Sequence, residues 1–193
     1  MKKAVASLET KYASLCVSVH QQEKQLDNCN RDTVSCNAII TGLPMTPHEN
    51  TSKIVEKTFS VVCPQLSIKQ VRHCERIKSA NSHNVTPPIR VMFHNSEAKH
   101  TFVNAKLQFG RLQACSIARH YGKSDQLISV RNELSALKVE LLHDLKNVQQ
   151  KFRLAYVWPS TGGEVLVKIK KSSAPIRIRT RSDVDKLIQS LSI

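Results

Sequence analysis

The sequence predicts a mixed α+β protein with an N-terminal coiled-coil helix, a split βαβ domain and a small α-β-β-β-α C-terminal domain. Three observations lead to this prediction. Apolar residues repeat every seven positions up to residue 29, short segments of changing period follow from residue 36, and a leucine-rich helical stripe begins near residue 131. We place the domains at 1–35, 36–130 and 131–193.

The first segment repeats apolar side chains at intervals of three and four residues, with no Pro or Gly before Gly42. This period favours a coiled coil of about four heptads, in which the polar Gln22 sets register or oligomer state. The alternative is one amphipathic helix packed on its own domain, because a helix this short is marginal alone in water. The predicted seam, expected to mediate dimer or trimer formation, consists of Met1, Val5, Leu8, Tyr12, Leu15, Val19, Gln22, Leu26 and Cys29.

The second segment alternates between strand and helix spacing, in the order β-α-β-β-α-β. RNA-recognition-motif (RRM) domains share this order, so the domain is predicted to be RRM-like. A base-stacking platform is not expected on its sheet, because Phe93 is the one aromatic of the central strands and is interpreted as core. The strands are predicted near 37–44, 68–77, 89–94 and 126–130, and the helices near 51–63 and 96–107. Thr51 or Ser52 is the expected cap of the first helix, and Asn95 or Ser96 that of the second.

The third segment begins with a long helix over about 132–151, whose leucines form one stripe. A hairpin and a third strand over 174–180 follow, then a closing helix for which Ser182 is the expected N-cap. Tyr156 and Trp158, in the first strand of the hairpin, are alternative candidates for base stacking, but we interpret both as core residues.

The net charge of the chain indicates the class of molecule to which the protein binds. Lys and Arg total 29 against 15 Asp and Glu, which gives a net charge of +14 and favours polyanions. The densest basic stretch lies between Val165 and Arg181, which contains no acidic residue. If the third strand continues to its end, Arg177, Arg179 and Arg181 share one face at spacings of about 7 Å, near the phosphate spacing of an extended single strand. The alternative is a charged edge strand that resists aggregation.

The predicted phosphate-contacting residues of the C-terminal stretch are Lys168, Lys170, Lys171, Arg177, Arg179 and Arg181. Two weaker groups of basic residues lie elsewhere in the sequence. Arg72 and Arg76, with Lys69 and Lys78, form a second group on the second strand. Arg119, Lys123 and Arg131, with His120, form a third group that we expect between the domains.

Other function classes find no support in the sequence. No run of about 18 apolar residues and no signal-peptide pattern occurs, so we expect a cytoplasmic or nuclear protein without membrane contact. The six cysteines lack metal-ligand spacing and are expected to be reduced core thiols. No nucleotide-binding or hydrolase motif is present, so we expect a non-enzymatic protein without cofactor or metal.

Three stretches, taken in order, carry a resemblance to a known family. They are Leu26–Arg31 with Asn37–Pro44, then Ser129–Ser135, then Tyr156–Trp158 with Val165–Lys168, Ile176–Ile178 and Ser182–Val184. On these motifs the chain resembles the baculovirus few-polyhedra (FP) protein family and its insect and transposon-borne relatives. It is similar in layout to first-open-reading-frame proteins of LINE-type retrotransposons. Where the family has a Ser-Arg-Arg patch before the first strand, this chain has Asn30-Arg31-Asp32.

The resemblance implies a coiled coil, an RRM-like domain and a C-terminal domain. In the retrotransposon relatives it implies trimeric, single-strand nucleic-acid binding with chaperone activity, and in the viral family a cytoplasmic or nuclear accessory protein. Together with the charge, it predicts an oligomeric binder of single-stranded RNA or DNA that contacts the phosphate backbone with low sequence specificity. The alternative is a coiled-coil interaction scaffold without nucleic-acid binding.

Overall fold

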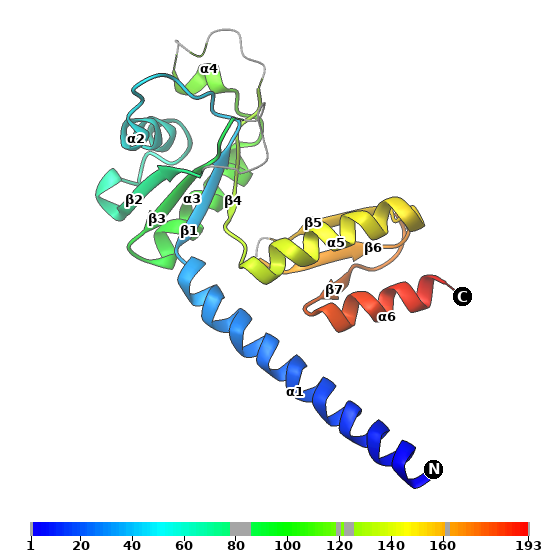
Figure 1. The fold of residues 1–193 in the computed structure, drawn as a ribbon. Helices are drawn as coiled ribbons and strands as arrows, with labels where there is room; N and C mark the ends of the chain where they lie inside the picture. The colour runs from blue at the N-terminus through cyan, green and yellow to red at the C-terminus, as the bar shows by residue number, and fades with distance from the viewer. Residues whose placement is uncertain (1, 78–85, 119–120, 122–125, 161–162, 193) are drawn as a thin grey trace. The chain divides into compact units, whose positions relative to one another are not determined.

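The protein is mixed α+β, as predicted, and its contacts divide it into two compact units (Figure 1). The computed structural model describes residues 2–77, 86–118, 121, 126–160 and 163–192. We call Val34–Glu133 the inserted unit, and Met1–Thr33 with Leu134–Ile193 the terminal unit. The N-terminal helix therefore groups with the C-terminal residues, whereas the sequence places it in a domain of its own.

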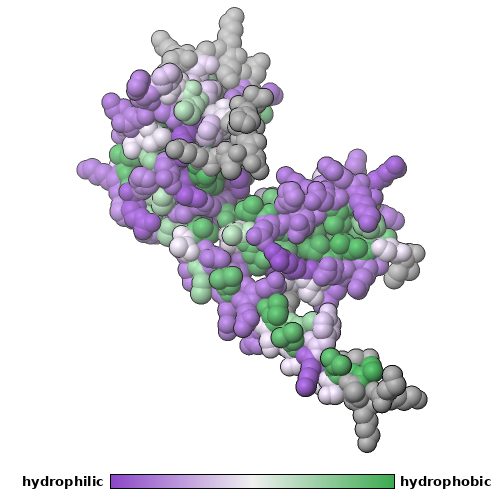
Figure 2. All heavy atoms as spheres, in the orientation of Figure 1, coloured by the Kyte–Doolittle hydropathy of each residue, from purple (hydrophilic) through white to green (hydrophobic). Residues whose placement is uncertain are grey.

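Helix α1 spans Lys2–Val34, a stretch free of helix-breaking Pro and Gly. Its predicted seam is exposed in the single chain: Leu8, Tyr12, Leu15 and Leu26 are 68%, 71%, 62% and 63% exposed. Figure 2 shows apolar side chains at several points along the visible side of this helix. Because position d follows position a by three residues, Tyr12 and Leu26 occupy position a, and Leu8, Leu15 and Gln22 occupy position d. Gln22 is thus not at the a position, where a polar residue sets register, and that expectation is wrong.

The C-terminal end of α1 is fixed to the rest of the terminal unit by Asp27. Its buried carboxylate accepts a 2.5 Å hydrogen bond from the Ser135 hydroxyl and lies 3.4 Å from the Lys138 ammonium. Asp27 points about 100° around the helix from Leu26. Intramolecular packing at Asp27 therefore uses a flank of α1. The seam residues Leu15 and Val19 border a pocket together with Arg181 and Asp185 of α6, yet they stay 62% and 47% exposed.

The inserted unit is a four-stranded antiparallel sheet in the order β2-β3-β1-β4, with helices packed on one face (Figure 1). Its strands are β1 (Asn37–Thr41), β2 (Val71–Arg76), β3 (Ile89–Phe93) and β4 (Ser129–Asn132). The helices are α2 (Thr51–Val62), the 3-10 helix η1 (Ile68–Gln70), α3 (Ser96–Phe109) and α4 (Ala114–Ile117).

Alternate strand residues of the inserted unit enter one aliphatic and aromatic core. Ala38 and Ile40 of β1 and Val91 of β3 are fully buried in it. Phe59 of α2 and Phe102 of α3 meet there edge to face, with ring centroids 4.9 Å apart. The intervening residues of β1 and β3 are thereby directed to the opposite face, which we call the open face because no helix of the inserted unit packs on it among the described residues, although Ile39 is buried there.

Two boundaries in the inserted unit differ from the prediction. Helix α2 is capped by Asn50, whose side chain accepts from the Lys53 amide, and not by Thr51 or Ser52. Strand β4 begins at Ser129, and Leu127 forms only an isolated bridge with Gln113. The cap of α3 is Asn95, one of its two predicted candidates.

The terminal unit places two helices on a three-stranded sheet of order β5-β6-β7 (Figure 1). The strands are β5 (Tyr156–Pro159), β6 (Val165–Lys168) and β7 (Ile176–Ile178), and the helices are α5 (Ala136–Phe152) and α6 (Arg181–Leu191).

The core of the terminal unit is aliphatic. Leu141 and Leu145 of α5 pack with Val165 and Val167 of β6. Tyr156 and Trp158 do not belong to this core, so their interpretation as core residues is wrong.

The cysteines divide between core and surface. Cys63 and Cys74 are buried, Cys36 and Cys115 are half-buried, and Cys16 and Cys29 are exposed on α1, all as free thiols. The prediction of core positions therefore holds for the first pair only.

Candidate nucleic-acid interface

The turn after β6 carries three lysines without acidic partners. Lys168 ends the strand, and Lys170 and Lys171 lie exposed in the turn that follows. The Lys170 amide donates to the Ser173 hydroxyl at 3.1 Å, and the Ser173 amide donates to the Lys170 carbonyl at 3.1 Å. Within the described part of the chain, none of the three lysines forms an ion pair. The turn thus presents an ordered backbone with uncompensated charge.

The arginines that follow do not form the predicted row on one strand. Strand β7 ends at Ile178, and Arg181 is the first residue of α6. The cause is a helix cap at Thr180: the Asp183 carboxylate accepts from the amides of Arg179 (2.9 Å) and Thr180 (3.1 Å). Backbone amides committed to a cap cannot continue a strand. The predicted N-cap Ser182 lies inside the helix instead.

A single carboxylate faces two of these arginines. Glu164, just before β6, lies 3.0 Å from Arg177 and 4.0 Å from Arg179, whose side chains are 54% and 61% exposed. Arg181 pairs separately with Glu140 at 2.5 Å. Among the described residues, the six cations of the stretch form ion pairs with two carboxylates, which leaves 6 − 2 = +4. Exposed pairs of this kind are weak and open to competition by another anion.

The backbone of Arg179 is held in place while its side chain is exposed. The carbonyl of Arg179 accepts a 2.8 Å hydrogen bond from the Lys138 ammonium, which also pairs with Asp27. Cations on α1 lie close to this point, because Lys24 and Arg31 line one pocket of about 350 Å³ together with Glu164 and Arg179. These two residues were missed from the sequence, although their seven-residue spacing places them on one side of the helix.

Arg76, a predicted phosphate contact, is fully engaged within the inserted unit. It donates twice to Glu49, at 2.6 and 2.9 Å, and to the carbonyls of Leu43, Pro44 and Pro87 at 2.8, 2.9 and 2.6 Å. A guanidinium has five N–H donors, and all five are used here. Arg76 thus has no donor left for a phosphate, and we leave it out of the interface.

The same ion pair changes the ionisation of Glu49. Burial alone raises the pKa of the Glu49 carboxyl, but the hydrogen bonds and charge of Arg76 outweigh it, and the net pKa lies below its usual value. The side chains of Arg76 and Glu49 are only 11% and 9% exposed. This pair therefore joins the segment after β1 to the end of β2 as a structural element.

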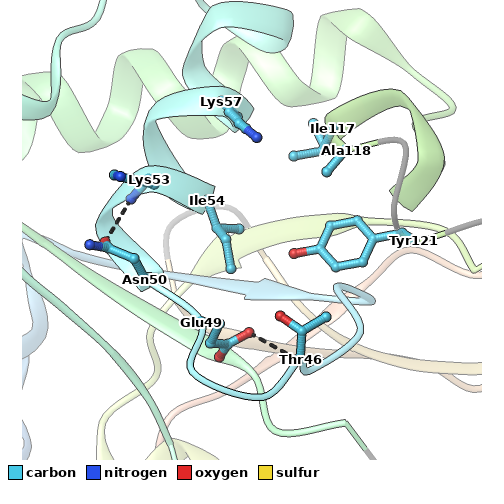
Figure 3. Close-up of a pocket in the computed structure, with 9 residues that line it drawn as sticks. All are labelled: Thr46, Glu49, Asn50, Lys53, Ile54, Lys57, Ile117, Ala118 and Tyr121. Carbon is cyan, nitrogen blue, oxygen red and sulfur yellow. Dashed lines mark hydrogen bonds between the residues drawn. The ribbon is translucent and has the colours of Figure 1, made fainter.

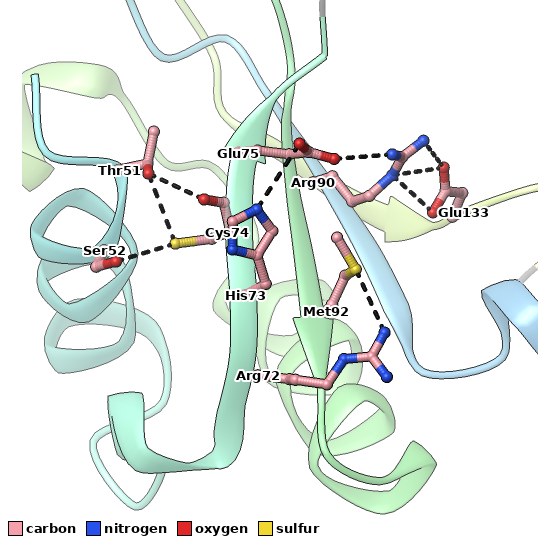
Figure 4. Close-up of polar contacts among 9 residues, drawn as sticks. All are labelled: Thr51, Ser52, Arg72, His73, Cys74, Glu75, Arg90, Met92 and Glu133. Atoms are coloured by element: carbon pink, nitrogen blue, oxygen red, sulfur yellow. Dashed lines mark hydrogen bonds and ion pairs between the residues drawn. The ribbon is translucent and has the colours of Figure 1, made fainter.

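The open face of the four-stranded sheet carries charge but no Phe, Tyr or Trp side chain, because Phe93, the one such residue of the four strands, points into the core. Arg90 of β3 lies between two carboxylates, with its side chain 3.0 Å from Glu75 and 2.6 Å from Glu133 (Figure 4). Arg131 is exposed on β4, opposite Ile39. The two acidic residues reduce the attraction of this face for a phosphate backbone.

The remaining predicted contacts are placed only in part. Arg72 is exposed beside a bulge of β2, with its guanidinium 3.7 Å from the Met92 sulfur (Figure 4). Arg119 and Lys123, like His120 and Lys78, lie outside the described residues.

A second pocket, of about 170 Å³, lies on the helical side of the inserted unit (Figure 3). Lys53 and Lys57 of α2 lie on one side of it, and the ring of Tyr121 extends from the other. Its one carboxylate, Glu49, is already held by Arg76. Burial raises the pKa of the Tyr121 hydroxyl, which keeps it neutral. The pocket therefore offers two lysines and little unengaged chemistry.

No family model matches the chain, and no curated protein matches it. The resemblance to the few-polyhedra family stays a prediction from its motifs. Among the residues placed by the structure, no helix has the length and apolar character needed to cross a membrane. Over the same residues, no three His, Cys, Asp or Glu side chains gather as metal ligands.

Proposed function

We propose that the protein binds single-stranded nucleic acid through the phosphate backbone, using the basic surface of the terminal unit. One observation carries the proposal: in the part of the chain that the structure describes, Lys168, Lys170 and Lys171 form no ion pair, and the neighbouring Arg177 and Arg179 share a single carboxylate. Phosphates compete well for such arginines, because the guanidinium fork fits an anionic oxygen pair and exposed ion pairs are weak. The contacts are to backbone, so little sequence specificity is expected.

The net charge of the stretch sets the size of the salt effect. Four uncompensated cations correspond to a slope of about −3 in a plot of log K against log salt, at 0.7 per phosphate on a single strand. We expect Arg177→Ala/Arg179→Ala to reduce the slope by about 1.4, from two cations at 0.7 each. Fluorescence anisotropy of a labelled 20-nucleotide oligomer, titrated at several salt concentrations, measures both values.

Two further variants sharpen this test. Glu164→Gln removes the carboxylate that competes for Arg177 and Arg179, so we expect tighter binding. The matched control is Lys53→Ala/Lys57→Ala on α2, which removes two exposed charges from the inserted unit. If the control weakens binding as much as the arginine variant does, general charge rather than this surface carries the binding.

We also propose that the inserted unit is RRM-like. Its element order β-α-β-β-α-β and its strand order β2-β3-β1-β4 support this assignment. Its open face lacks the aromatic residues with which such sheets stack bases. Binding by this unit is therefore expected to be secondary to the terminal unit.

We further propose that α1 self-associates as a coiled coil through its exposed seam. The anchor at Asp27 occupies a flank of the helix, and the seam residues Leu8, Tyr12, Leu15 and Leu26 are more than 60% exposed. Seven-residue spacing makes this seam self-complementary. Leu8→Asp/Leu15→Asp is expected to give monomers in light scattering, whereas Ser14→Asp, at position c on the side of the helix away from the seam, is expected to leave the oligomer intact.

The alternative function is a coiled-coil scaffold without nucleic-acid binding. The exposed seam favours it, because Leu8, Tyr12 and Leu15 need a helical partner whatever the basic surface does. Light scattering with a labelled oligonucleotide separates the two functions. Oligomers that bind no oligonucleotide at physiological salt would support the scaffold and exclude the binder.

A further inference from the structure

The three-stranded sheet of the terminal unit has one face turned away from its core. Val157 of β5 and Val165 and Val167 of β6 contact the helices α5 and α6 through the core. Their strand neighbours must point the other way, because successive side chains of a strand alternate between faces. We call this second side the outer face. It is made up of Tyr156, Trp158, Glu164, Leu166, Lys168 and Arg177.

Cross-strand register and ion pairs agree on the members of the outer face. Trp158 is paired with Leu166, and Tyr156 with Lys168. Leu166 is in turn paired with Arg177. Residues directly opposite one another share a face of the sheet. The 3.0 Å pair of Glu164 with Arg177 confirms this, since both side chains must lie on the same side.

Two aromatic residues are displayed on one edge strand of this face. Tyr156 is 48% exposed, and Trp158, the single tryptophan of the chain, is half-buried and outside the core cluster. They are two residues apart on β5, so their rings are spaced by about 7 Å along the strand. Val157 of the same strand packs in the core, whereas Tyr156 and Trp158 lie outside it. This difference indicates that the two aromatic side chains act at the surface.

Basic side chains are placed among these rings. Lys168 lies directly across from Tyr156, and Arg177 lies two strands from Trp158 with Leu166 between them. Rings that accept a base, beside cations that hold the phosphates, are the combination found in single-strand binding sites. A duplex does not use such a platform, because its bases are already stacked and paired.

We propose that the outer face is a base-stacking platform, on which Tyr156 and Trp158 each stack an unpaired base while Lys168 and Arg177 hold the adjoining phosphates. This proposal rests on the proposed function and adds to it the class of ligand: a strand with exposed, unpaired bases. Stacking tolerates any base, so the platform is compatible with low sequence specificity.

The single tryptophan makes the platform directly observable. Two end-labelled 20-mers are compared, oligo-dT and an abasic strand with the same number of phosphates. Anisotropy of the label measures binding, and Trp158 fluorescence reports on stacking. We expect oligo-dT to bind and quench Trp158, and the abasic strand to bind about ten-fold more weakly for each lost stack, without quenching.

Variants test the two rings separately. Trp158→Leu and Tyr156→Leu are each expected to weaken oligo-dT binding about ten-fold and to leave abasic binding unchanged. Trp158→Phe and Tyr156→Phe keep a ring and are expected to restore most of the affinity. If a leucine variant does not fold by circular dichroism, the quenching of the wild-type protein decides.

The outcomes separate this proposal from the proposed function. Equal binding of both strands without quenching would refute the platform and leave backbone binding intact. Failure of both strands to bind would refute both proposals. Quenching by oligo-dT alone, with loss in the leucine variants and rescue by phenylalanine, would support both.

Discussion

Replacement of Arg76 by methionine is the sharpest test of its structural role in the inserted unit. The change removes all five hydrogen bonds of the guanidinium and leaves the Glu49 carboxylate, only 9% exposed, without its cation. Removal of one partner from a buried ion pair costs about 3–5 kcal/mol, mainly because the other charge stays buried. We expect the free energy of unfolding to fall by this amount.

Hydrogen exchange of peptides from β1 and β3 measures this loss for the inserted unit alone. The matched control is Arg72→Met on the same strand, where the side chain is exposed. A surface substitution of this kind changes the free energy of unfolding by less than about 0.5 kcal/mol. If Arg76→Met leaves exchange unchanged but weakens binding of single-stranded nucleic acid, our reasoning about Arg76 is refuted.

The pH dependence of the same variant gives a second check. In the native protein the pKa of Glu49 is below its usual value, so its stabilisation is present above the pKa of the unfolded chain. That stabilisation is lost as the pH falls through the lowered, folded-state pKa. In Arg76→Met the buried carboxyl can instead take up a proton. We therefore expect the difference in stability between wild type and variant to shrink as the pH falls below 5, in exchange experiments corrected for intrinsic rates.

Two further substitutions test local features. Gly42→Ala is expected to lower the free energy of unfolding by at least about 2 kcal/mol, because φ is +87° and the new Cβ would lie 2.1 Å from a backbone oxygen. Gly163→Ala, with φ +77° and open space around the new Cβ, is expected to lower it by about 1 kcal/mol. Circular dichroism melts measure both losses, and equal losses would contradict the clash at Gly42. Asp27→Ala is expected to lower the free energy of unfolding by about 3 kcal/mol, because buried Lys138 loses its carboxylate partner. The exposed control Asp144→Ala is expected to change it by less than about 0.5 kcal/mol. Urea unfolding followed by tryptophan fluorescence measures this difference, and similar midpoints for the two variants would refute the role of Asp27 as an anchor.

Local patterns in the sequence were sufficient for several elements. The change from helical to strand spacing at Asn37 coincides with the start of β1, and Asn95 was among the predicted caps of α3. Thr180 carried a signal that competed with the strand pattern, since an acidic residue three positions later is typical of a capping box. The alternation of arginines was the more visible signal, but the cap ends the strand.

Long-range pairings were beyond the reach of local patterns. Glu164 neutralises Arg177 only because the register of β6 and β7 brings Leu166 opposite that arginine. Arg76 meets Glu49 across 27 residues, which no period in the sequence indicates. Charge counting identified the basic segment, whereas the partners that compensate it depend on the folded sheet. The same holds for Trp158, whose face is fixed by register.

The placement of the inserted unit between the two parts of the terminal unit bears on how the chain folds. Asp27 and Lys138 are 138 − 27 = 111 residues apart, so their contact closes a long loop. Yet β1 and β4 are neighbours, and the Glu133 amide donates to the Asn37 carbonyl at 3.2 Å. Once the sheet has formed, the chain between α1 and α5 is in effect only a few residues long. This shortening lowers the entropic cost of closing the loop between Asp27 and Lys138 by about 2 kcal/mol. Folding of the inserted unit therefore favours the contact between α1 and α5.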